Sequence, residues 1–517
     1  MTQLSHLLRL RDQGVRFDAY LMDAFWYAPD GGYREWRKPH WPDGPERWLM
    51  ACQESGLLPG LWFTVNTLCH LEPTPKWRDS VDEKGWGMSL CEGGFLHDFA
   101  HVLDHWYSRG VRIFKFDFAE FRAVPAGTAE VPVNIRRDNV AAFREMLWKF
   151  RHGHPEAILM AFNGFEESEC MDRTDRKLRQ CIDPAWLESF DSLYCGDPRP
   201  ADVPDVDFWR SVDLYSDHMV RVFERSEIPL DRIDNCGFMA GPTGTCYWRG
   251  KAGWKRMLLL SLARGGRIHV AYGDLSQFSD EDARWWAAAQ ALYAPSMLPA
   301  GTQLWGDAPG NGAPYGWLSL REESAVFTLV NPGPLPEQVP LWKMTEWRLA
   351  TCEPGFAAEI RGQEIKLGPG QVAVLTEGPI ELGFSLEGEA RAVTCRVVEA
   401  AGVKPADGGW VLAFDAIDAE SACLIVQQKD SLGYVVRNYP TEHDWAFRAE
   451  FRMGGEVVAV QDFPPRKVWS GMSWACFPLP EALLGREFSV FVESTATTPI
   501  ELDAHVRLTT GPAVLGA

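Results

Sequence analysis

The stretch Val111-Arg-Ile-Phe-Lys-Phe-Asp-Phe-Ala-Glu120 alternates apolar and polar residues and ends in charge. Its Ile and Phe residues favour a buried strand. Lys115 and Asp117 lie two positions apart, so on a strand both side chains point to the same face, and Glu120 follows just beyond the expected end of the strand. Ionisable groups at the C-terminal end of a strand are typical of catalytic sites in βα barrels. A purely structural lysine–carboxylate pair is the alternative that this stretch leaves open.

The composition indicates a folded globular protein of two to four domains. The chain has 517 residues, of which 46% are hydrophobic and 24% are charged. Its net charge of -20 argues against binding to nucleic acid or to an anionic membrane, because neither surface would be attracted to it. The 23 Trp residues exceed the usual packing need, and tryptophans in clefts stack on sugar rings.

The N-terminal segment Met1–Leu10 lacks a long apolar core and a cleavage site, and no run of about eighteen apolar residues occurs anywhere. The 12 Cys residues are scattered without a CxxC pair, which is typical of reduced, mostly buried thiols. We therefore expect a cytoplasmic protein without membrane or nucleic-acid partners.

Short apolar runs alternate with helical patterns from Phe17 to about Gly273, which is typical of repeated βα units around a parallel sheet. Eight strands are predicted: Phe17–Phe25, Gly60–Val65, Met88–Cys91, Arg112–Phe118, Ala157–Phe162, Ser189–Cys195, Ile233–Met239 and Arg267–Tyr272. Helices are predicted at Pro45–Ser55, Phe95–Ser108, Arg137–Phe150, Phe208–Arg225 and Gly253–Ala263. Eight such units predict an α/β fold, a (β/α)8 TIM barrel over residues 1–305.

After a helical segment at Ala283–Leu292 the pattern changes to short alternating strands separated by Pro and Gly clusters such as Asn331-Pro-Gly-Pro-Leu-Pro. This pattern predicts an all-β sandwich over residues 306–382. A separate set of strands predicts a second β-rich C-terminal domain over residues 383–517, in which a packing role for the tryptophans is favoured over carbohydrate binding.

The predicted strand ends collect polar and aromatic side chains, and in a barrel these ends meet at one mouth. The side chains, in chain order, are Asp23, Trp26, Trp62, Lys115, Asp117, Asn163, and Arg199 within a loop rich in carboxylates. Carboxylates, a lysine and an amide can bind the hydroxyl groups of a sugar, and an indole can stack on its ring. Two carboxylates from different strands are also the minimum machinery for cleaving a glycosidic bond.

The order Leu21-Met-Asp-Ala-Phe-Trp26, Gly60-Leu-Trp-Phe63 and Phe114-Lys-Phe-Asp117 resembles the α-galactosidase superfamily, the clan of glycoside hydrolase families 36 and 27. Family 36 enzymes have Asp-Asp-Gly-Trp, Gly-Leu-Trp-Phe and Lys-Trp-Asp at these strands. The resemblance implies that Asp117 is the nucleophile and that Lys115 binds substrate hydroxyls. It covers about residues 15 to 300 and continues more faintly to about 380.

The resemblance also implies an acid/base aspartate in the loop after the sixth predicted strand. The sequence Arg199-Pro-Ala-Asp202 is the best match, so Asp202 is assigned this role. Asp205 and Asp207 are close enough in sequence to be the acid instead, and Asp197 is a weaker rival.

Three departures separate this chain from family 36. The first strand carries one aspartate, Asp23, where the family has two that hold the sugar's 4- and 6-hydroxyls. The fifth-strand Cys-Ser-Gly-Gly motif is replaced by Ala161-Phe-Asn-Gly164. Most family members carry a β-sandwich before the barrel, whereas the sequence here begins almost at the first predicted strand, so we expect a homo-oligomer or the C-terminal domains to close the cleft.

We therefore expect a retaining exo-acting α-glycosidase, most similar to α-galactosidases, that acts on an oligosaccharide or glycoside and needs no cofactor or metal. A transglycosylase of the raffinose-synthase kind and a non-catalytic carbohydrate-binding protein of the same fold are the alternatives. His152-Gly-His154 has ligand-like spacing, but it is expected on a helix-to-strand loop at the opposite end of the barrel and favours a solvated turn over a metal site.

Overall fold

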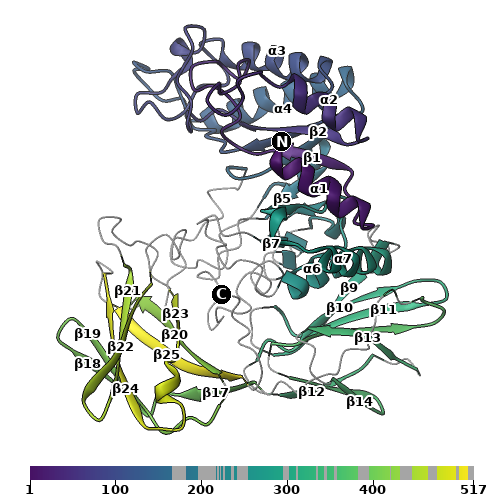
Figure 1. The fold of residues 1–517 in the computed structure, drawn as a ribbon. Helices are drawn as coiled ribbons and strands as arrows, with labels where there is room; N and C mark the ends of the chain where they lie inside the picture. The colour runs from purple at the N-terminus through teal and green to yellow at the C-terminus, as the bar shows by residue number, and fades with distance from the viewer. Residues whose placement is uncertain are drawn as a thin grey trace. The chain divides into compact units, whose positions relative to one another are not determined.

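The computed structural model describes residues 1–165, 182–195, 217, 220–221, 223–224, 227–234, 238–240, 254–294, 302–309, 313–333, 336–342, 346–353, 358–368, 370–381, 383, 395–419, 421–430, 445–463, 474–495 and 500–509 (Figure 1). The chain divides into two compact units, the first formed by Met1–Gly196 with Phe223–Asp234 and the second by Asp197–Val222 with Asn235–Ala517. The domain boundaries expected at residues 305 and 382 remain predictions.

The first unit is built on a parallel sheet with the strand order β1-β2-β3-β4-β5-β6. The strands are β1 (Ala19–Met22), β2 (Leu58–Thr64), β3 (Ile113–Asp117), β4 (Ile158–Ala161), β5 (Ser192–Tyr194) and β6 (Ile233–Asp234). The α-helices described in this unit are α1 (Thr2–Asp12), α2 (Glu46–Glu54), α3 (Phe95–Ser108) and α4 (Ile135–Gly153), with short 3-10 turns at Arg78–Ser80, Pro184–Glu188 and Leu230–Arg232. Sequential strands are therefore neighbours, as in a βα barrel.

The parallel register puts Lys115 and Asp117 on one face of this sheet and the rings that contact the helices on the other. Trp62 pairs with Lys115 and Thr64 pairs with Asp117, so these four side chains share a face. The opposite face packs against the helices through ring contacts from successive strands: Tyr20 with Trp48 of α2, Phe63 with Phe99 of α3, and Phe114 with Phe150 of α4. The helices therefore cover the apolar face of the sheet.

Helix α3 shows why these segments are helical. Its buried residues Phe95, Phe99, Val102, Leu103 and Trp106 recur at helical spacing and form one apolar stripe. The helix begins directly after Gly94, whose φ of 82° lies in the left-handed region. Burying each large side chain contributes about 1.5–3 kcal/mol, so packing of this stripe holds the helix on the sheet.

The strand predicted at Met88–Cys91 is wrong. Met88 and Ser89 instead bond to residues earlier in the connection after β2, because the Met88 N–H donates to Asn66 O at 2.8 Å and the Ser89 N–H donates to Ser80 O at 2.7 Å. Only an isolated antiparallel bridge joins Val81 to Met88. The apolar run is buried, but it belongs to the connection between β2 and α3.

The strand predicted at Ile233–Met239 is divided between the two units. Its first residues form β6, and its last residues belong to β7 (Phe238–Ala240), which pairs in parallel with β8 (Ala271–Gly273). With this division and the loss of Met88–Cys91, the described parallel strands are again eight. The second unit continues with the helices α6 (Trp254–Ala263) and α7 (Asp280–Tyr293) and a 3-10 turn at Leu275–Gln277.

Two antiparallel sheets follow in the second unit, with the strand orders β13-β16-β11-β10-β9 and β12-β15-β14. The strands are β9 (Thr302–Gly306), β10 (Tyr315–Leu320), β11 (Ala325–Val330), β12 (Glu337–Pro340), β13 (Arg348–Glu353), β14 (Glu359–Arg361), β15 (Glu364–Leu367) and β16 (Val372–Glu377). They share one buried core, to which β11 contributes Phe327 and β15 contributes Ile365. This pattern is a small β-sandwich.

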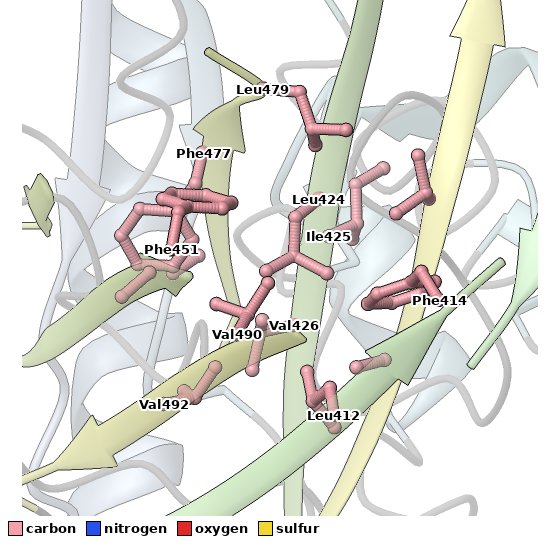
Figure 2. Close-up of a cluster of buried hydrophobic side chains, with 14 of the residues drawn as sticks. Leu412, Phe414, Leu424, Ile425, Val426, Phe451, Phe477, Leu479, Val490 and Val492 are labelled. Carbon is pink, nitrogen blue, oxygen red and sulfur yellow. The ribbon is translucent and has the colours of Figure 1, made fainter. Parts of the chain in front are cut away.

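The last part of the chain forms a second pair of antiparallel sheets, β17-β25-β20-β23 and β18-β19-β24-β21-β22. The strands are β17 (Cys395–Glu399), β18 (Gly402–Ala406), β19 (Gly409–Phe414), β20 (Ser421–Asp430), β21 (Phe447–Met453), β22 (Glu456–Phe463), β23 (Trp474–Pro478), β24 (Phe488–Ser494) and β25 (Ile500–Thr509), with a 3-10 turn at Glu481–Leu483. Figure 2 shows their core, where Leu424 and Phe477 of one sheet meet Phe451 and Val490 of the other.

Candidate active site

The C-terminal ends of β1 and β3 bring a carboxylate and an amine into contact. Lys115 lies on β3, and its Nζ is 3.1 Å from Oδ2 of Asp23, which directly follows β1. The lysine side chain is 8% exposed and the Asp23 side chain is 31% exposed. The two charged groups predicted from separate strand ends therefore form an ion pair, and its carboxylate is the part open to solvent.

Asp117 ends β3 and is 6% exposed. Its Oδ1 accepts hydrogen bonds from the Phe118 backbone N–H at 2.9 Å and from the Asn163 backbone N–H and side-chain amide, each at 3.0 Å. Its Oδ2 accepts a hydrogen bond from the Trp62 indole N–H at 3.0 Å. Donors from β2, from the segment after β4 and from the next residue along the chain thus fix the orientation of this carboxylate. All four contacts are N–H donors, which an ionised carboxylate can accept at its two oxygens.

Two stacked rings line the neighbourhood of Lys115. Its Nζ lies 4.0 Å from the centre of the Phe162 ring, and Phe162 stacks on Tyr194 with 4.2 Å between ring centres. Both rings are almost fully buried. The ammonium group therefore has a carboxylate on one side and an aromatic face on another, an arrangement that stabilises a positive charge in a place with little water.

Gly164 determines where Asn163 lies. Its φ is 100°, and a Cβ at this position would lie 2.3 Å from the backbone nitrogen of Ala119. The Ala119 N–H donates to the Asn163 carbonyl at 3.2 Å, so the chain after β3 and the chain after β4 touch here. Only glycine fits this close approach, which places both Asn163 donors beside Asp117.

Trp26 is not an exposed sugar platform, contrary to the role predicted for it. It is 1% exposed, and its indole N–H donates to the Trp62 carbonyl at 2.9 Å. Its ring packs against Trp36 and Trp106, with ring centres 5.2 and 5.3 Å away. Trp62 is also 1% exposed, and in this structure it contacts the site through the hydrogen bond to Asp117.

Glu120 anchors the loop after β3 through its backbone. Asn66 is fully buried, and its side-chain amide donates to the carbonyls of Glu120 at 2.9 Å and Met88 at 2.7 Å, while its Oδ1 accepts from the Glu120 N–H at 2.7 Å. The Glu120 carboxylate accepts from the Arg122 N–H at 3.0 Å. Sequence reasoning missed Asn66, although an asparagine just after a buried strand is a signal for this kind of loop anchor.

Two further groups near the site were missed. Asp234 ends β6 in register with Tyr194 and is 5% exposed, so it is a buried carboxylate on the same face as Asp117. Tyr27 stacks parallel to Trp62 with 6.1 Å between ring centres. Burial raises the pKa of Tyr27 well above its ordinary value, and the neighbouring Cys69, Asp23 and Asp117 raise it further. Tyr27 is therefore a neutral phenol beside the site.

The predicted acid/base residue Asp202 and the predicted substrate-binding residue Arg199 lie outside the described residues, as do Asp197, Asp205 and Asp207. Among the residues that the structure describes, no group of three or more His, Cys, Asp or Glu is arranged to hold a metal ion. Within the described part of the chain, no helix has both the length and the apolar character that a membrane span requires.

The chain has the fold of TIM-barrel glycosidases, a parallel α/β region followed by antiparallel β-sheets, and this confirms the predicted fold class. No family model and no curated protein sequence matches it.

Among solved structures, it is similar to an α-galactosidase from Lactobacillus brevis, with a TM-score of 0.51 and 10% identity over 74% of this chain and 52% of that one. It is also similar to a substituted form of the GH36 α-galactosidase AgaA from Geobacillus stearothermophilus in complex with stachyose, with a TM-score of 0.51 and 10% identity over 72% of this chain and 53% of that one. The chain thus spans about half the length of these enzymes.

Proposed function

We propose that this protein is a retaining exo-acting α-glycosidase, similar to α-galactosidases, which hydrolyses a terminal α-linked sugar. The observation that carries the proposal is the buried carboxylate of Asp117, held by donors from three chain segments next to the Asp23–Lys115 ion pair. A carboxylate fixed at the end of a barrel strand suits attack on an anomeric carbon, because its orientation is set before substrate arrives. The shared fold with α-galactosidases is consistent with this function.

Asp23 and Lys115 are suited to bind the hydroxyl groups of the terminal sugar. The Asp23 carboxylate accepts hydrogen bonds and the Lys115 ammonium donates them, so adjacent hydroxyls of one ring can each find a partner. Because the lysine side chain is only 8% exposed, such bonds would form away from competing water.

The reaction follows two displacements. In the first, an oxygen of Asp117 attacks the anomeric carbon, the glycosidic C–O bond breaks, and the leaving oxygen takes a proton from Asp202. In the second, Asp202 takes a proton from water, the water oxygen bonds to the anomeric carbon, and the ester to Asp117 breaks. Each displacement inverts the configuration, so the sugar is released in the α-form. The role of Asp202 rests on the sequence resemblance.

The test of the nucleophile is Asp117→Asn, with Asp104→Asn as the matched control. Asp104 lies on α3 and contacts His154 at 2.8 Å, outside the proposed site. On a panel of aryl α-glycosides we expect Asp117→Asn to lower kcat by at least about 1000-fold and Asp104→Asn to leave it unchanged. Near wild-type turnover by Asp117→Asn would reject the assignment.

Rescue by azide distinguishes the nucleophile from the acid/base residue, because each variant yields a different glycosyl azide. With Asp117→Gly, azide can take the place of the nucleophile in a single displacement and yield a β-glycosyl azide. With Asp202→Ala, azide attacks the glycosyl-enzyme and yields an α-glycosyl azide. NMR of the products assigns both roles. An α-azide from the Asp117 variant, or no rescue of Asp202→Ala with rescue of Asp205→Ala or Asp207→Ala, would contradict the proposed roles.

A further inference from the structure

Phe25 and His70 form an exposed ring pair near the candidate site. Phe25 is 48% exposed, His70 is also exposed, and their ring centres are 4.5 Å apart with 48° between the ring planes. Phe25 follows Asp23 in the chain after β1, and His70 lies in the chain after β2. Both rings therefore lie beyond the C-terminal ends of strands that contribute to the site.

Both residues have a backbone conformation that residues other than glycine rarely adopt. The φ angle is 73° at Phe25 and 57° at His70, and this left-handed geometry is strained for a residue with a side chain. Strain of this kind persists where the surroundings enforce it, and it concentrates at functional sites. The Phe118 residue directly after Asp117 shows the same geometry, with φ of 50°.

The contacts on either side explain how the strain is maintained. The turn at Phe25 sends the next residue, Trp26, into the core, where its indole N–H bonds to the Trp62 carbonyl at 2.9 Å. The Tyr27 hydroxyl bonds to the Cys69 carbonyl at 3.3 Å, which ties the chain before His70 to the chain after Phe25. The Phe25 ring is thus held outside while its neighbours are buried.

The ring pair also has a polar neighbour. The guanidinium carbon of Arg37 lies 6.0 Å from the centre of the Phe25 ring, and guanidinium groups donate to hydroxyl oxygens. By contrast, Lys115 and Asp117 are 7% and 6% exposed. Lys115 and Asp117 are therefore buried while the two rings are exposed, as expected when buried groups hold a terminal sugar and the next sugar remains nearer to solvent.

We propose that Phe25 and His70 form the stacking platform for the sugar on the leaving-group side, with Arg37 donating to its hydroxyls. The apolar C–H face of a pyranose would lie on the Phe25 ring. This inference rests on the proposed function and extends it, because it specifies oligosaccharides, rather than glycosides of small leaving groups, as the substrate class.

Phe25→Gly tests the platform without threatening the fold. It removes the ring, and glycine relieves the left-handed strain, so the melting temperature should stay level or rise. The probes are α-galactosyl fluoride paired with raffinose, and α-glucosyl fluoride paired with maltotriose; the fluorides carry no leaving sugar. We expect kcat/KM for the oligosaccharide to fall about tenfold, that for the fluoride to change less than about twofold, and Phe25→Trp to keep the wild-type ratio.

Trp148→Ala is the matched control. Trp148 on α4 is 58% exposed and also stacks on a histidine, with 3.9 Å between its ring centre and that of His152. Trp148→Ala should leave kcat/KM unchanged for both the fluoride and the oligosaccharide. Two results with Phe25→Gly would overturn the platform: an equal loss of kcat/KM on fluoride and oligosaccharide, or no loss on either. A wild-type enzyme that cleaves a fluoride but neither oligosaccharide would overturn it as well. A wild-type enzyme inactive on all four probes would instead reject the proposed function, and this inference with it.

Discussion

Replacing Gly164 by alanine places a single methyl group between the chain after β3 and the chain after β4. The added Cβ would lie 2.3 Å from the Ala119 nitrogen and 2.6 Å from its carbonyl oxygen, and these backbone atoms cannot rotate away. The φ of 100° adds about 1–2 kcal/mol for a residue with a side chain. The two segments must separate, which breaks the 3.2 Å bond from the Ala119 N–H to the Asn163 carbonyl.

The separation reaches Asp117 through Asn163. Asn163 donates to Asp117 Oδ1 twice, at 3.0 Å from the backbone and 3.0 Å from the side chain, and a hydrogen bond to a charged acceptor contributes about 1.5–3 kcal/mol. If the resulting misorientation of the carboxylate raises the transition state by about 3 kcal/mol relative to the free enzyme and substrate, kcat/KM falls roughly 150-fold. The assay is kcat/KM on the best aryl α-glycoside, with the melting temperature measured alongside.

Gly110→Ala is the control for backbone strain alone. Gly110 has φ of 102°, almost the same as Gly164, but its Cβ would meet nothing within 4 Å. We expect both variants to lose stability and only Gly164→Ala to lose activity. Equal kcat/KM in the two variants would refute the argument that the close approach at Gly164 positions Asn163.

Three further predictions concern stability. Burial raises the pKa of Asp98, but hydrogen bonds from Arg34, Trp77 and Lys76 outweigh it and hold that pKa below its ordinary value. The stabilisation is therefore present above the unfolded-state pKa and is lost as pH falls through the folded-state pKa. In urea unfolding between pH 7 and 3, the free energy of unfolding should fall less with acid in Asp98→Asn than in the wild type. Trp26→Ala should lower the free energy of unfolding by about 3–5 kcal/mol, whereas Phe25→Gly should not lower it; a similar loss in both would contradict their opposite orientations. Asn66→Ala should cost at least about 2 kcal/mol in the same assay because it leaves the backbone groups of Met88 and Glu120 without this partner, and a loss below about 0.5 kcal/mol would count against the anchor.

The polar face of the sheet could be predicted because it depends on strand geometry alone. A side-chain period of two puts Lys115 and Asp117 on one face in any strand, and parallel neighbours bring Trp62 and Asn163 to the same edge. Asp23 follows from the same rule. These contacts follow from the local pattern within each strand, even though the residues are far apart in the chain.

The remaining features depend on tertiary contacts that no local pattern reveals. Phe25 and Trp26 are adjacent aromatics, and only the left-handed turn at Phe25 determines which ring is buried. Most of the run Met88–Cys91 is buried like a strand, but its backbone partners are Asn66 and Ser80 in the connection between β2 and α3. In both cases the surrounding packing overrides the pattern that predicted the other outcome.

The packing around Trp26 also gives this unit an optical signature of its own folding. The indole of Trp36 lies between those of Trp26 and Trp48, with ring centres 5.2 and 5.6 Å away, and Trp106 lies 5.3 Å from Trp26. Indoles this close and this rigid couple their electronic transitions, which produces near-ultraviolet circular dichroism that a loosened core loses. Loosening of the core around these four indoles can therefore be followed through this signal, with no label and no substrate.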